Sequence, residues 1–394
     1  MTRRSPGPIL FVATGVHGAV GGIASANRNV LAALRRVGEE TGRPVRTLVL
    51  GEPGGPDEAC RGFDGRKAAF ALATLASLPT AGLAVFDHVN IARPILALPR
   101  RFRPPVVVCA HGSEASRRLR PSGAAVFRSA DLVLTNSGFT LQRMRAHVGR
   151  FRGVACPLGL PPQFEVTGSP PAPGGGVVKL AAADGVTRAL GDQVLLLVGR
   201  MDAGEQEKGH RELLDAMPDL LARRPGAQLV FAGGGSDLAG LRREAAASPA
   251  AASIFLTGLA PKELLETLYR KAFAFVMPSR QEGFGLVYLE AMNYAKPCLA
   301  CREDGGADVV ADGETGVLVS PAVERGELVG ALDGLLGDPD RARRLGEAGW
   351  RRLVREFSSS AHQERVAGFV RPLLAARGIR RSAASDMAAR VWNA

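Results

Sequence analysis

One stretch organises this chain: AFVMPSRQEGFGLVYLEAMNYAKPCLA, residues 274–300. It opens on the short apolar run 274–277, continues through a glycine-flanked turn, and closes on a second apolar run at 296–300. Strands that are buried in a parallel sheet are continuous apolar runs of this kind. The segment between the two runs has room for one helix. The pattern therefore predicts a strand, turn, helix and strand in succession, with the helix beginning near Phe284.

Two carboxylates bracket the turn and the first part of this helix. Glu282 and Glu290 are separated by seven residues, which is about two turns of a helix. If the intervening segment is helical, both side chains can face one crevice and accept hydrogen bonds from hydroxyl groups. The first amides of the helix form a cradle for phosphate. The alternative for an isolated pair of acids is a helix cap and a solvated helix residue.

A second predicted loop supplies two cations. The apolar run 194–198 leads to Arg200, and after a polar loop Lys208 precedes an amphipathic helical pattern. An ammonium and a guanidinium on one strand-end loop suit a diphosphate, since lysine acts as a point charge and arginine can donate two parallel hydrogen bonds. Two solvated loop cations are the alternative if these residues are taken alone.

Together, the two loops resemble the retaining glycosyltransferases of family 4, which carry an E-x7-E motif matched here by Glu282 and Glu290. The resemblance runs almost from end to end and is tighter in the second half. The loop 201–207 is similar to that of a subgroup linked to exopolysaccharide assembly. The other matching segments, in the family's order, are 21–23, 111–114, 130–140, 156–160, 231–235, 257–259, 264–269, 304–308 and 312–319.

The resemblance implies a GT-B fold, with two doubly wound Rossmann-like domains whose parallel sheets face a central cleft. Independently, apolar runs alternate with helical patterns in both halves, which predicts an α/β fold with parallel sheets. A Pro/Gly-rich stretch at 166–192 is the predicted linker between an acceptor-side domain, 1–165, and a donor domain, 193–357. The family further implies that helices within 358–394 pack back on the first domain.

The resemblance also implies that a nucleotide-sugar donor lies mainly on the second domain. It assigns catalytic roles to His111, Arg200, Lys208 and Glu282. Arg200 and Lys208 match diphosphate contacts, Glu282 matches a contact to the sugar hydroxyls, and Glu290 matches a contact to the ribose. The residues expected to bind the donor are Gly22, Arg200, Lys208, Gly258, Leu259, Glu282, Gly283, Phe284, Gly285, Leu286 and Glu290.

Two of these donor-binding positions depend on the backbone. The family places the nucleobase near Gly258 and Leu259, and Gly22 opens a helix whose amino end can approach the donor phosphate. The glycines between residues 15 and 22 also allow a dinucleotide site, but their spacing is not G-x-G-x-x-G. An NAD-dependent oxidoreductase is therefore the weaker alternative, and a non-catalytic scaffold on the GT-B fold is the other.

Composition limits the partners. The 394 residues suffice for two domains, and no apolar stretch approaches the roughly 20 residues that cross a bilayer. Five scattered cysteines indicate a reducing cytoplasm rather than a disulfide scaffold. A net charge of +12 favours an anionic partner such as a lipid-linked acceptor at the inner membrane surface, or reflects arginine-rich composition alone. An aromatic content of 5% with no recognised motif argues against nucleic-acid binding.

The expected reaction is transfer of a hexose from a donor of the UDP-glucose or GDP-mannose type. The acceptor is expected to be a hydroxyl group, either on a lipid-linked oligosaccharide in polysaccharide assembly or on a small-molecule metabolite. The family implies attack on the same face as the leaving group, with no protein nucleophile and with no metal or cofactor. The D-x-D pattern at 338–340 is expected to cap a helix rather than bind a metal.

Overall fold

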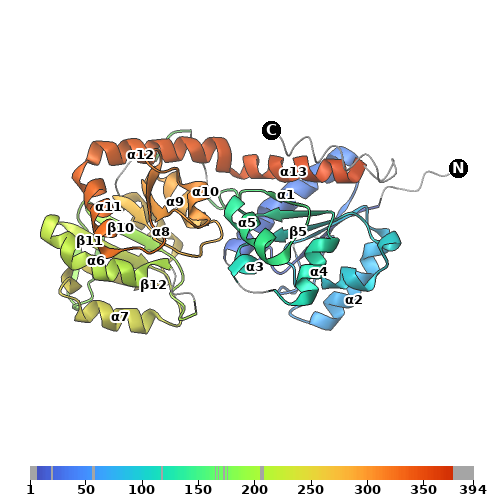
Figure 1. The fold of residues 1–394 in the computed structure, drawn as a ribbon, viewed down its shortest axis with the longest axis horizontal. Coiled ribbons are helices and arrows are strands. Elements are labelled where there is room, and N and C mark those ends of the chain that lie inside the picture. Colours follow the sequence, from blue (N-terminus) through green and yellow to red (C-terminus); the bar gives the residue numbers. More distant parts are fainter. Residues whose placement is uncertain are drawn as a thin grey trace. The chain divides into compact units, whose positions relative to one another are not determined.

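The structure, a computed structural model, describes residues 7–18, 21–55, 58–116, 119–164, 166, 168–171, 174, 176–204 and 208–375. Parts of three segments singled out from the sequence, 166–192, 201–207 and 358–394, lie outside the described residues. The chain divides into two compact units (Figure 1). The first unit comprises residues 1–163 and 358–394, and the second comprises residues 164–357.

The first unit is built on one parallel sheet in the order β3-β2-β1-β4-β5-β6-β7. The strand order reverses between β1 and β4, which is the arrangement of a doubly wound sheet. The strands are β1 (Ile9–Ala13), β2 (Val45–Val49), β3 (Cys60–Gly62), β4 (Leu83–Phe86), β5 (Val106–Ala110), β6 (Leu132–Thr135) and β7 (Gly153–Ala155). The helices are α1 (Gly22–Thr41), α2 (Lys67–Ser77), α3 (Ser113–Ser116), α4 (Pro121–Ser129), α5 (Gly138–Val148) and α13 (Ser359–Ala375).

Helix α13 belongs to the first unit although it comes last in the described chain. Its residues Val366, Ala367, Val370 and Leu374 are buried in the same apolar cluster as strand residues of β1 and β4. Helix α1 covers this face beside α13, and the two helices lie next to each other in Figure 1. The core of the first unit is therefore completed by residues from beyond the second unit.

The second unit is built on a six-stranded parallel sheet in the order β12-β11-β10-β13-β14-β15. The strands are β10 (Gln193–Val198), β11 (Ala227–Ala232), β12 (Ile254–Gly258), β13 (Ala274–Val276), β14 (Cys298–Cys301) and β15 (Gly316–Val319). The helices are α6 (His210–Arg223), α7 (Leu238–Ala247), α8 (Lys262–Lys271), α9 (Leu286–Asn293), α10 (Gly306–Val309), α11 (Arg325–Gly337) and α12 (Pro339–Arg352).

A short antiparallel hairpin lies at the edge of the second sheet. Its strands are β8 (Lys179–Ala181) and β9 (Thr187–Ala189), and a bridge between Ala182 and Phe255 connects it to β12. The hairpin falls within the segment 166–192 that the sequence analysis predicts as a linker. Each of these strands has three residues, the first and third of which are exposed, so there is no apolar run to indicate a strand. The prediction of a linker therefore rests on the proline and glycine content.

The α/β class with parallel sheets in both halves is confirmed. The expected strand, turn, helix and strand at 274–300 are β13, the turn, α9 and β14. Helix α9 begins at Leu286, two residues later than predicted from the sequence. Asp338 caps α12, because its side chain accepts a hydrogen bond from the Arg341 amide at 2.8 Å.

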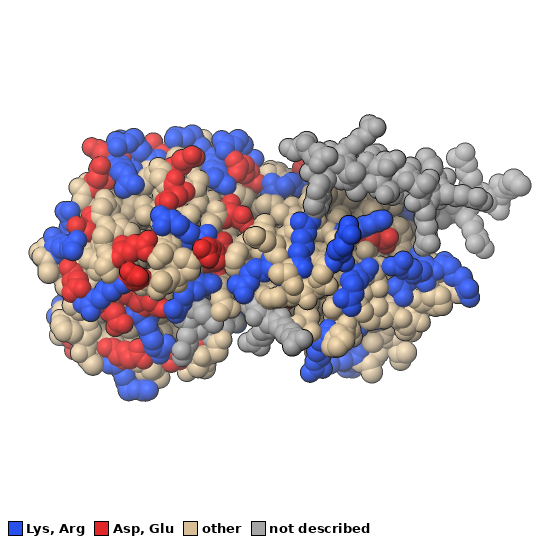
Figure 2. All heavy atoms as spheres, in the orientation of Figure 1, with Lys and Arg blue, Asp and Glu red and all other residues tan. Residues whose placement is uncertain are grey.

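Charge is unevenly spread over the surface. On the face drawn in Figure 2, blue basic side chains dominate the described part of the first unit, whereas both signs mix over the second unit. Among the described residues, no helix is long and apolar enough to cross a membrane.

Candidate active site

An ion pair stands at the carboxyl edge of the second sheet. Lys208 follows β10 and Glu282 follows β13, which is the neighbouring strand. The Lys208 Nζ lies 2.9 Å from the Glu282 Oε2, and the two side chains are 20% and 19% exposed. The structure therefore brings together a cation and an anion that the sequence analysis placed on separate loops. Ligands of doubly wound sheets bind at this edge.

The charge of Glu282 is maintained by its neighbours. Burial acts to raise the pKa of this carboxyl, but the charge and hydrogen bond of Lys208 and the amides of Phe284 and Gly283 outweigh it and hold the pKa below its usual value. Glu282 is thus ionised at neutral pH, and its oxygens act only as hydrogen-bond acceptors. Such a group suits the hydroxyls of a sugar.

The turn after Glu282 is held by the next loop of the sheet. The Glu282 carbonyl accepts a hydrogen bond from the Gly305 amide at 2.8 Å. A Cβ at Gly305 would lie 2.2 Å from the Gly283 carbonyl oxygen, so only glycine allows the two loops to touch. Gly285, with φ of 84°, is the N-cap residue of α9. Its left-handed conformation explains why the helix starts at Leu286.

Asp304, a residue given no role in the sequence analysis, fixes this arrangement. It is 2% exposed, its Oδ1 accepts from the Gly306 amide at 2.7 Å, and its Oδ2 accepts from the Glu282 amide at 3.4 Å. Burial raises the pKa of Asp304 to about 8, and the negative charge of Glu282 adds to this effect against the backbone hydrogen bonds. Asp304 is therefore largely protonated at neutral pH and positions the backbone of Glu282.

The donor-binding positions from Gly283 to Leu286 lie in this turn and at the first residue of α9. The side chain of Phe284 is 1% exposed and packs against Phe357, with 6.0 Å between ring centroids. The Phe284 side chain is thus part of the core, and its amide interacts with the Glu282 carboxylate. The amides at the start of α9 lack helical partners, as at any helix N-terminus, and form an anion-binding end.

Glu290 has a partner of its own. It lies on α9, and its Oε2 accepts a hydrogen bond from the Tyr269 hydroxyl at 2.8 Å. Burial raises the pKa of Glu290 to about 7, although the Tyr269 hydrogen bond acts to lower it. The two carboxylates of the motif therefore differ in state, since Glu282 is ionised and Glu290 is close to half-protonated at neutral pH. Tyr269 lies on α8 and is buried, and no pattern in the sequence pairs it with Glu290.

We expect Tyr269→Phe to lower the free energy of unfolding more at high than at low pH. Because folding raises the pKa of Glu290, its contribution to stability is present below its unfolded-state pKa and is lost as pH rises through about 7. Removing the hydroxyl also removes the hydrogen bond that lowers this pKa, so the pKa rises further. The added loss of stability is on the order of 1 kcal/mol near pH 8, the usual contribution of one hydrogen bond, and is smaller near pH 5. Urea unfolding at the two pH values measures the difference.

Tyr294→Phe is the matched control for this variant. Tyr294 stacks on Tyr269 with 5.4 Å between centroids and an interplanar angle of 4°, and phenylalanine preserves that stack. The control is expected to show the same loss of stability at both pH values. A Tyr269→Phe effect that is equal at both pH values would contradict the role of the hydroxyl in holding the Glu290 charge.

Three further predicted residues lie at the same edge of the sheet. Arg200 follows β10; its side chain is 68% exposed and its Nη1 is 3.6 Å from Asp202. Gly258 ends β12, and its carbonyl accepts a hydrogen bond from the Gly233 amide at 2.8 Å. Leu259 comes next and is 87% exposed. An exposed apolar side chain at a strand end gives a flat ring, such as a nucleobase, a surface to pack on.

In the first unit, His111 is fixed at the carboxyl end of β5. Its amide donates to the Glu114 Oε2 at 3.0 Å, and its carbonyl accepts from the Asn136 side chain at 2.9 Å. The ring Nε2 lies 2.8 Å from the Asp87 carbonyl oxygen. Because a carbonyl can only accept, Nε2 carries the proton, and in the neutral ring Nδ1 carries the lone pair.

Asp87 organises the neighbouring strand ends and was not singled out in the sequence. It is completely buried at the end of β4, and its Oδ2 accepts from the Thr14 amide at 2.8 Å, the Thr14 hydroxyl at 2.6 Å and the Asn27 side chain at 2.6 Å. These bonds tie β4 to the loop before α1, whose first residue is Gly22. The sequence signal for this role of Asp87 is the position of an acidic residue directly after the apolar run that forms β4.

No metal centre is formed by the described residues: among them, no group of three or more His, Cys, Asp or Glu side chains is arranged to hold an ion. The C-x-x-C residues Cys298 and Cys301 are both buried in β14. Burial raises the pKa of both thiols, to about 12 for Cys301, so they behave as apolar core residues.

Comparison with known proteins agrees with the fold. Residues 184–352 match the family model described as glycosyl transferases group 1. This matched segment contains Arg200, Lys208, Glu282 and Glu290. A mannosyltransferase of Mycolicibacterium smegmatis, named as GDP-mannose-dependent alpha-(1-6)-phosphatidylinositol monomannoside mannosyltransferase, is 30% identical over 256 residues, which is 62% of this chain and 64% of the relative.

A second relative is the D-inositol 3-phosphate glycosyltransferase of Nocardia farcinica, 37% identical over 40% of this chain and 36% of the relative. The chain thus spans less than two thirds of the length of these curated relatives. Among solved structures, the sucrose-phosphate synthase of Thermosynechococcus elongatus has a TM-score of 0.71 at 22% identity, over 94% of this chain and all of that one. HepE of Anabaena, solved with UDP and glucose, has a TM-score of 0.68 at 16% identity, over 93% of this chain and all of that one.

These similarities confirm that the fold is that of the GT-B glycosyltransferases. The matched segment 184–352 lies within the second unit and is similar to the glycosyl transferases group 1, and both relatives are named as glycosyl- or mannosyltransferases.

Proposed function

We propose that this protein is a retaining glycosyltransferase that moves a hexose from a nucleotide sugar to a hydroxyl acceptor. The observation that carries the proposal is the ion pair of Lys208 and Glu282, 2.9 Å apart, beside the amino end of α9. A cation, an ionised acceptor and a helix N-terminus at one strand edge provide the contacts that a sugar diphosphate requires.

Each residue has a proposed role in donor binding. Lys208 and Arg200 contact the diphosphate, and Glu282 accepts hydrogen bonds from the hydroxyls of the transferred sugar. Glu290, held by Tyr269, accepts from the ribose. The amino end of α9, from Gly285 and Leu286 onward, offers backbone amides, and the exposed Leu259 after Gly258 packs against the base. In the first unit, Gly22 and His111 are the proposed contributors to the same reaction.

The proposed chemistry needs no protein nucleophile. As the bond between sugar and phosphate breaks, the leaving diphosphate gains negative charge. Lys208, Arg200 and the amino end of α9 oppose that charge in a preorganised site. The acceptor hydroxyl attacks on the same face, and the leaving phosphate oxygen takes its proton. The cations already present neutralise the diphosphate, so the proposal includes neither a metal nor a cofactor.

For the donor we propose a GDP- or UDP-linked hexose. The relative from Mycolicibacterium smegmatis is named as GDP-mannose-dependent, which supports the first. For the acceptor we propose a lipid-linked oligosaccharide of the exopolysaccharide type at the cytoplasmic membrane face, supported by the net charge of +12 and the basic surface in Figure 2. A soluble metabolite is the second candidate acceptor. One relative is named D-inositol 3-phosphate glycosyltransferase, and D-inositol 3-phosphate is a small polar molecule.

A thermal-shift screen tests the donor class. The purified protein is mixed, in a buffer that contains EDTA, with UDP, GDP, ADP or NAD. The sugar conjugates of UDP, GDP and ADP are tested in the same way. We expect a selective rise in melting temperature with UDP or GDP, because a ligand at 100 times its Kd stabilises the folded state by about 2.7 kcal/mol. Glu290→Gln is expected to reduce the rise, and Glu263→Gln, on the exposed face of α8, is the matched control.

Other outcomes of the screen would contradict the proposal. A shift with NAD alone would indicate an oxidoreductase, and no shift with any nucleotide would indicate a non-catalytic scaffold. If the screen is repeated with a divalent ion in place of EDTA and the shift appears only then, the metal-free reaction is contradicted. Incubation of the bound sugar nucleotide with lipid-linked or soluble acceptors then separates the two acceptor classes by the product formed.

A further inference from the structure

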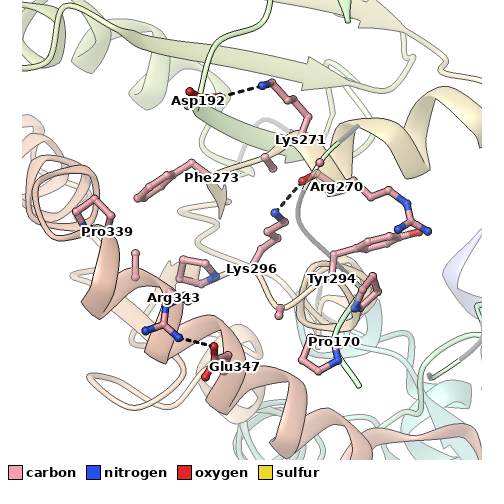
Figure 3. A pocket seen from close by; sticks show the side chains of 16 residues that line it. Pro170, Asp192, Arg270, Lys271, Phe273, Tyr294, Lys296, Pro339, Arg343 and Glu347 are labelled. Atoms are coloured by element: carbon pink, nitrogen blue, oxygen red, sulfur yellow. Dashed lines mark hydrogen bonds and ion pairs between the residues drawn. The ribbon is translucent and has the colours of Figure 1, made fainter. Parts of the chain in front are cut away.

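A cavity of about 630 Å3 opens in the second unit, away from the proposed donor site (Figure 3). It lies at the amino ends of β13 and β14, where Phe273 and Pro297 line it just before each strand begins. Lys208 and Glu282 follow the carboxyl ends of their strands, so the two sites are at opposite edges of the parallel sheet. The end of α8, the first half of α12 and the described residues Pro170, Pro171 and Gly174 form other parts of the wall.

Two lysines supply the positive charge of this cavity. Lys296 is only 8% exposed, and among the described residues its ammonium has one hydrogen bond, to the Arg270 carbonyl oxygen at 2.8 Å. An ammonium has three donors, so two remain for a ligand. Lys271, with a side chain 17% exposed, is 3.1 Å from Asp192. Burial and the nearby charge of Lys271 lower the pKa of Lys296 to about 8.

The charge of these lysines is incompletely balanced. The Asp192 side chain is 99% exposed, and exposed ion pairs contribute little and are easily exchanged. Arg343 also lines the cavity but is paired with Glu347 at 2.8 Å. Two ammonium groups held with a single exposed carboxylate constitute a site for an added anion, since a desolvated cation is costly unless it is paired.

Part of the lining is apolar. Phe273 and Pro297 provide flat surfaces, and Tyr294 forms part of the wall in Figure 3. The Tyr294 ring is held in place, because it stacks on Tyr269 and has the Arg270 guanidinium 5.4 Å from its centroid. The volume lies in the range of about 300–1,000 Å3 that is typical of sites for small organic ligands.

We propose that this cavity binds a small organic phosphate, whose phosphate group meets the ammonium groups of Lys271 and Lys296 and whose body packs on Phe273, Tyr294 and Pro297. A phosphate monoester carries close to two negative charges at neutral pH, which matches two ammonium groups better than a single carboxylate does. The site shares no residue with the proposed donor site, and so it does not depend on the proposed function.

Isothermal titration with glucose 6-phosphate, inorganic phosphate and malonate tests the proposal. We expect saturable binding of glucose 6-phosphate at one site, with inorganic phosphate weaker and malonate weakest. Lys271→Met and Lys296→Met are each expected to weaken binding at least tenfold. Lys262→Met, which removes an exposed lysine at the other end of α8, is the matched control and is expected to bind as the wild type does.

The location of binding is tested with Lys208→Met, which removes a cation of the proposed donor site and is expected to leave glucose 6-phosphate binding unchanged. If Lys296→Met does not fold, Lys271→Met still tests the location of binding. The Lys271 side chain is nearer to solvent than that of Lys296, so its replacement disturbs the fold less. The proposal is overturned if no saturable binding occurs, if the cavity variants bind as tightly as Lys262→Met, if malonate binds as well as the phosphates, or if only Lys208→Met weakens binding.

Discussion

Replacing Lys208 with methionine is expected to lower turnover about 10²–10³-fold, the usual cost of removing one group that stabilises charge in a transition state. Methionine keeps the length of the side chain and removes its charge. The Lys208 Nζ is the cation nearest to Glu282, at 2.9 Å, and in the proposed reaction it opposes the charge of the leaving diphosphate. Sugar transfer from the donor identified by the nucleotide screen is the measurement, with Lys262→Met as the control for loss of a lysine.

A double variant separates catalysis from simple charge pairing. Lys208→Met leaves the Glu282 carboxylate without its strong ion pair, which is expected to lower the melting temperature as well. Adding Glu282→Gln removes that unpaired charge, so the melting temperature is expected to recover while turnover stays low. Recovery of turnover in the double variant, or wild-type activity in Lys208→Met alone, would contradict the role of Lys208 at the diphosphate.

The second large effect concerns the stability of the first unit. Val370 on α13 is completely buried in the apolar cluster that also contains strands β1 and β4. Val370→Asp places a carboxylate there without a partner, and we expect it to lower the free energy of unfolding of this unit by more than about 3 kcal/mol. Urea unfolding, with the nucleotide-induced thermal shift followed in parallel, is the measurement.

Gly368→Asp is the matched control on the same helix. Gly368 is exposed, and a Cβ added there would have no heavy atom within 4 Å. We expect its effect to stay within about 0.5 kcal/mol, as for most surface substitutions. If Val370→Asp is as mild as Gly368→Asp, α13 does not complete the core of the first unit.

The sequence predicted the elements around the candidate active site well, because the signals there are local. The apolar runs at 274–277 and 296–300 correspond to β13 and β14, and a glycine-flanked turn leads to α9. Asp338 caps α12 as predicted, since capping depends on a residue and its next few neighbours. The α/β class followed from the same alternation in both halves of the chain.

The parts that the sequence could not supply depend on contacts between distant residues. The partner of Glu290 is Tyr269 on another helix, and the support of the Glu282 turn is Asp304 on another loop. Periodicity within α9 reveals neither of them. Asp87 is similar, because its role comes from Thr14 and Asn27, which the sheet order brings to it.

Loop conformation explains the remaining difference at the site. The helix was expected near Phe284, but Gly285 adopts a left-handed conformation and the Phe284 ring turns into the core against Phe357. A phenylalanine in a glycine-rich motif gives no indication of whether its ring is buried or faces a ligand. The contact with Phe357 determines that the ring is buried, and Phe357 lies beyond α12 in the chain.

The late position of α13 in the chain sets an order of events during synthesis. The polypeptide leaves the first unit after Gln163 and returns at Ser358, so about 200 residues emerge from the ribosome in between. At roughly 5–20 residues per second, this interval lasts roughly 10–40 s. The second unit is complete when it emerges, whereas the first keeps an apolar face open on α1 and the sheet until α13 arrives. That nascent face is where a chaperone would be needed.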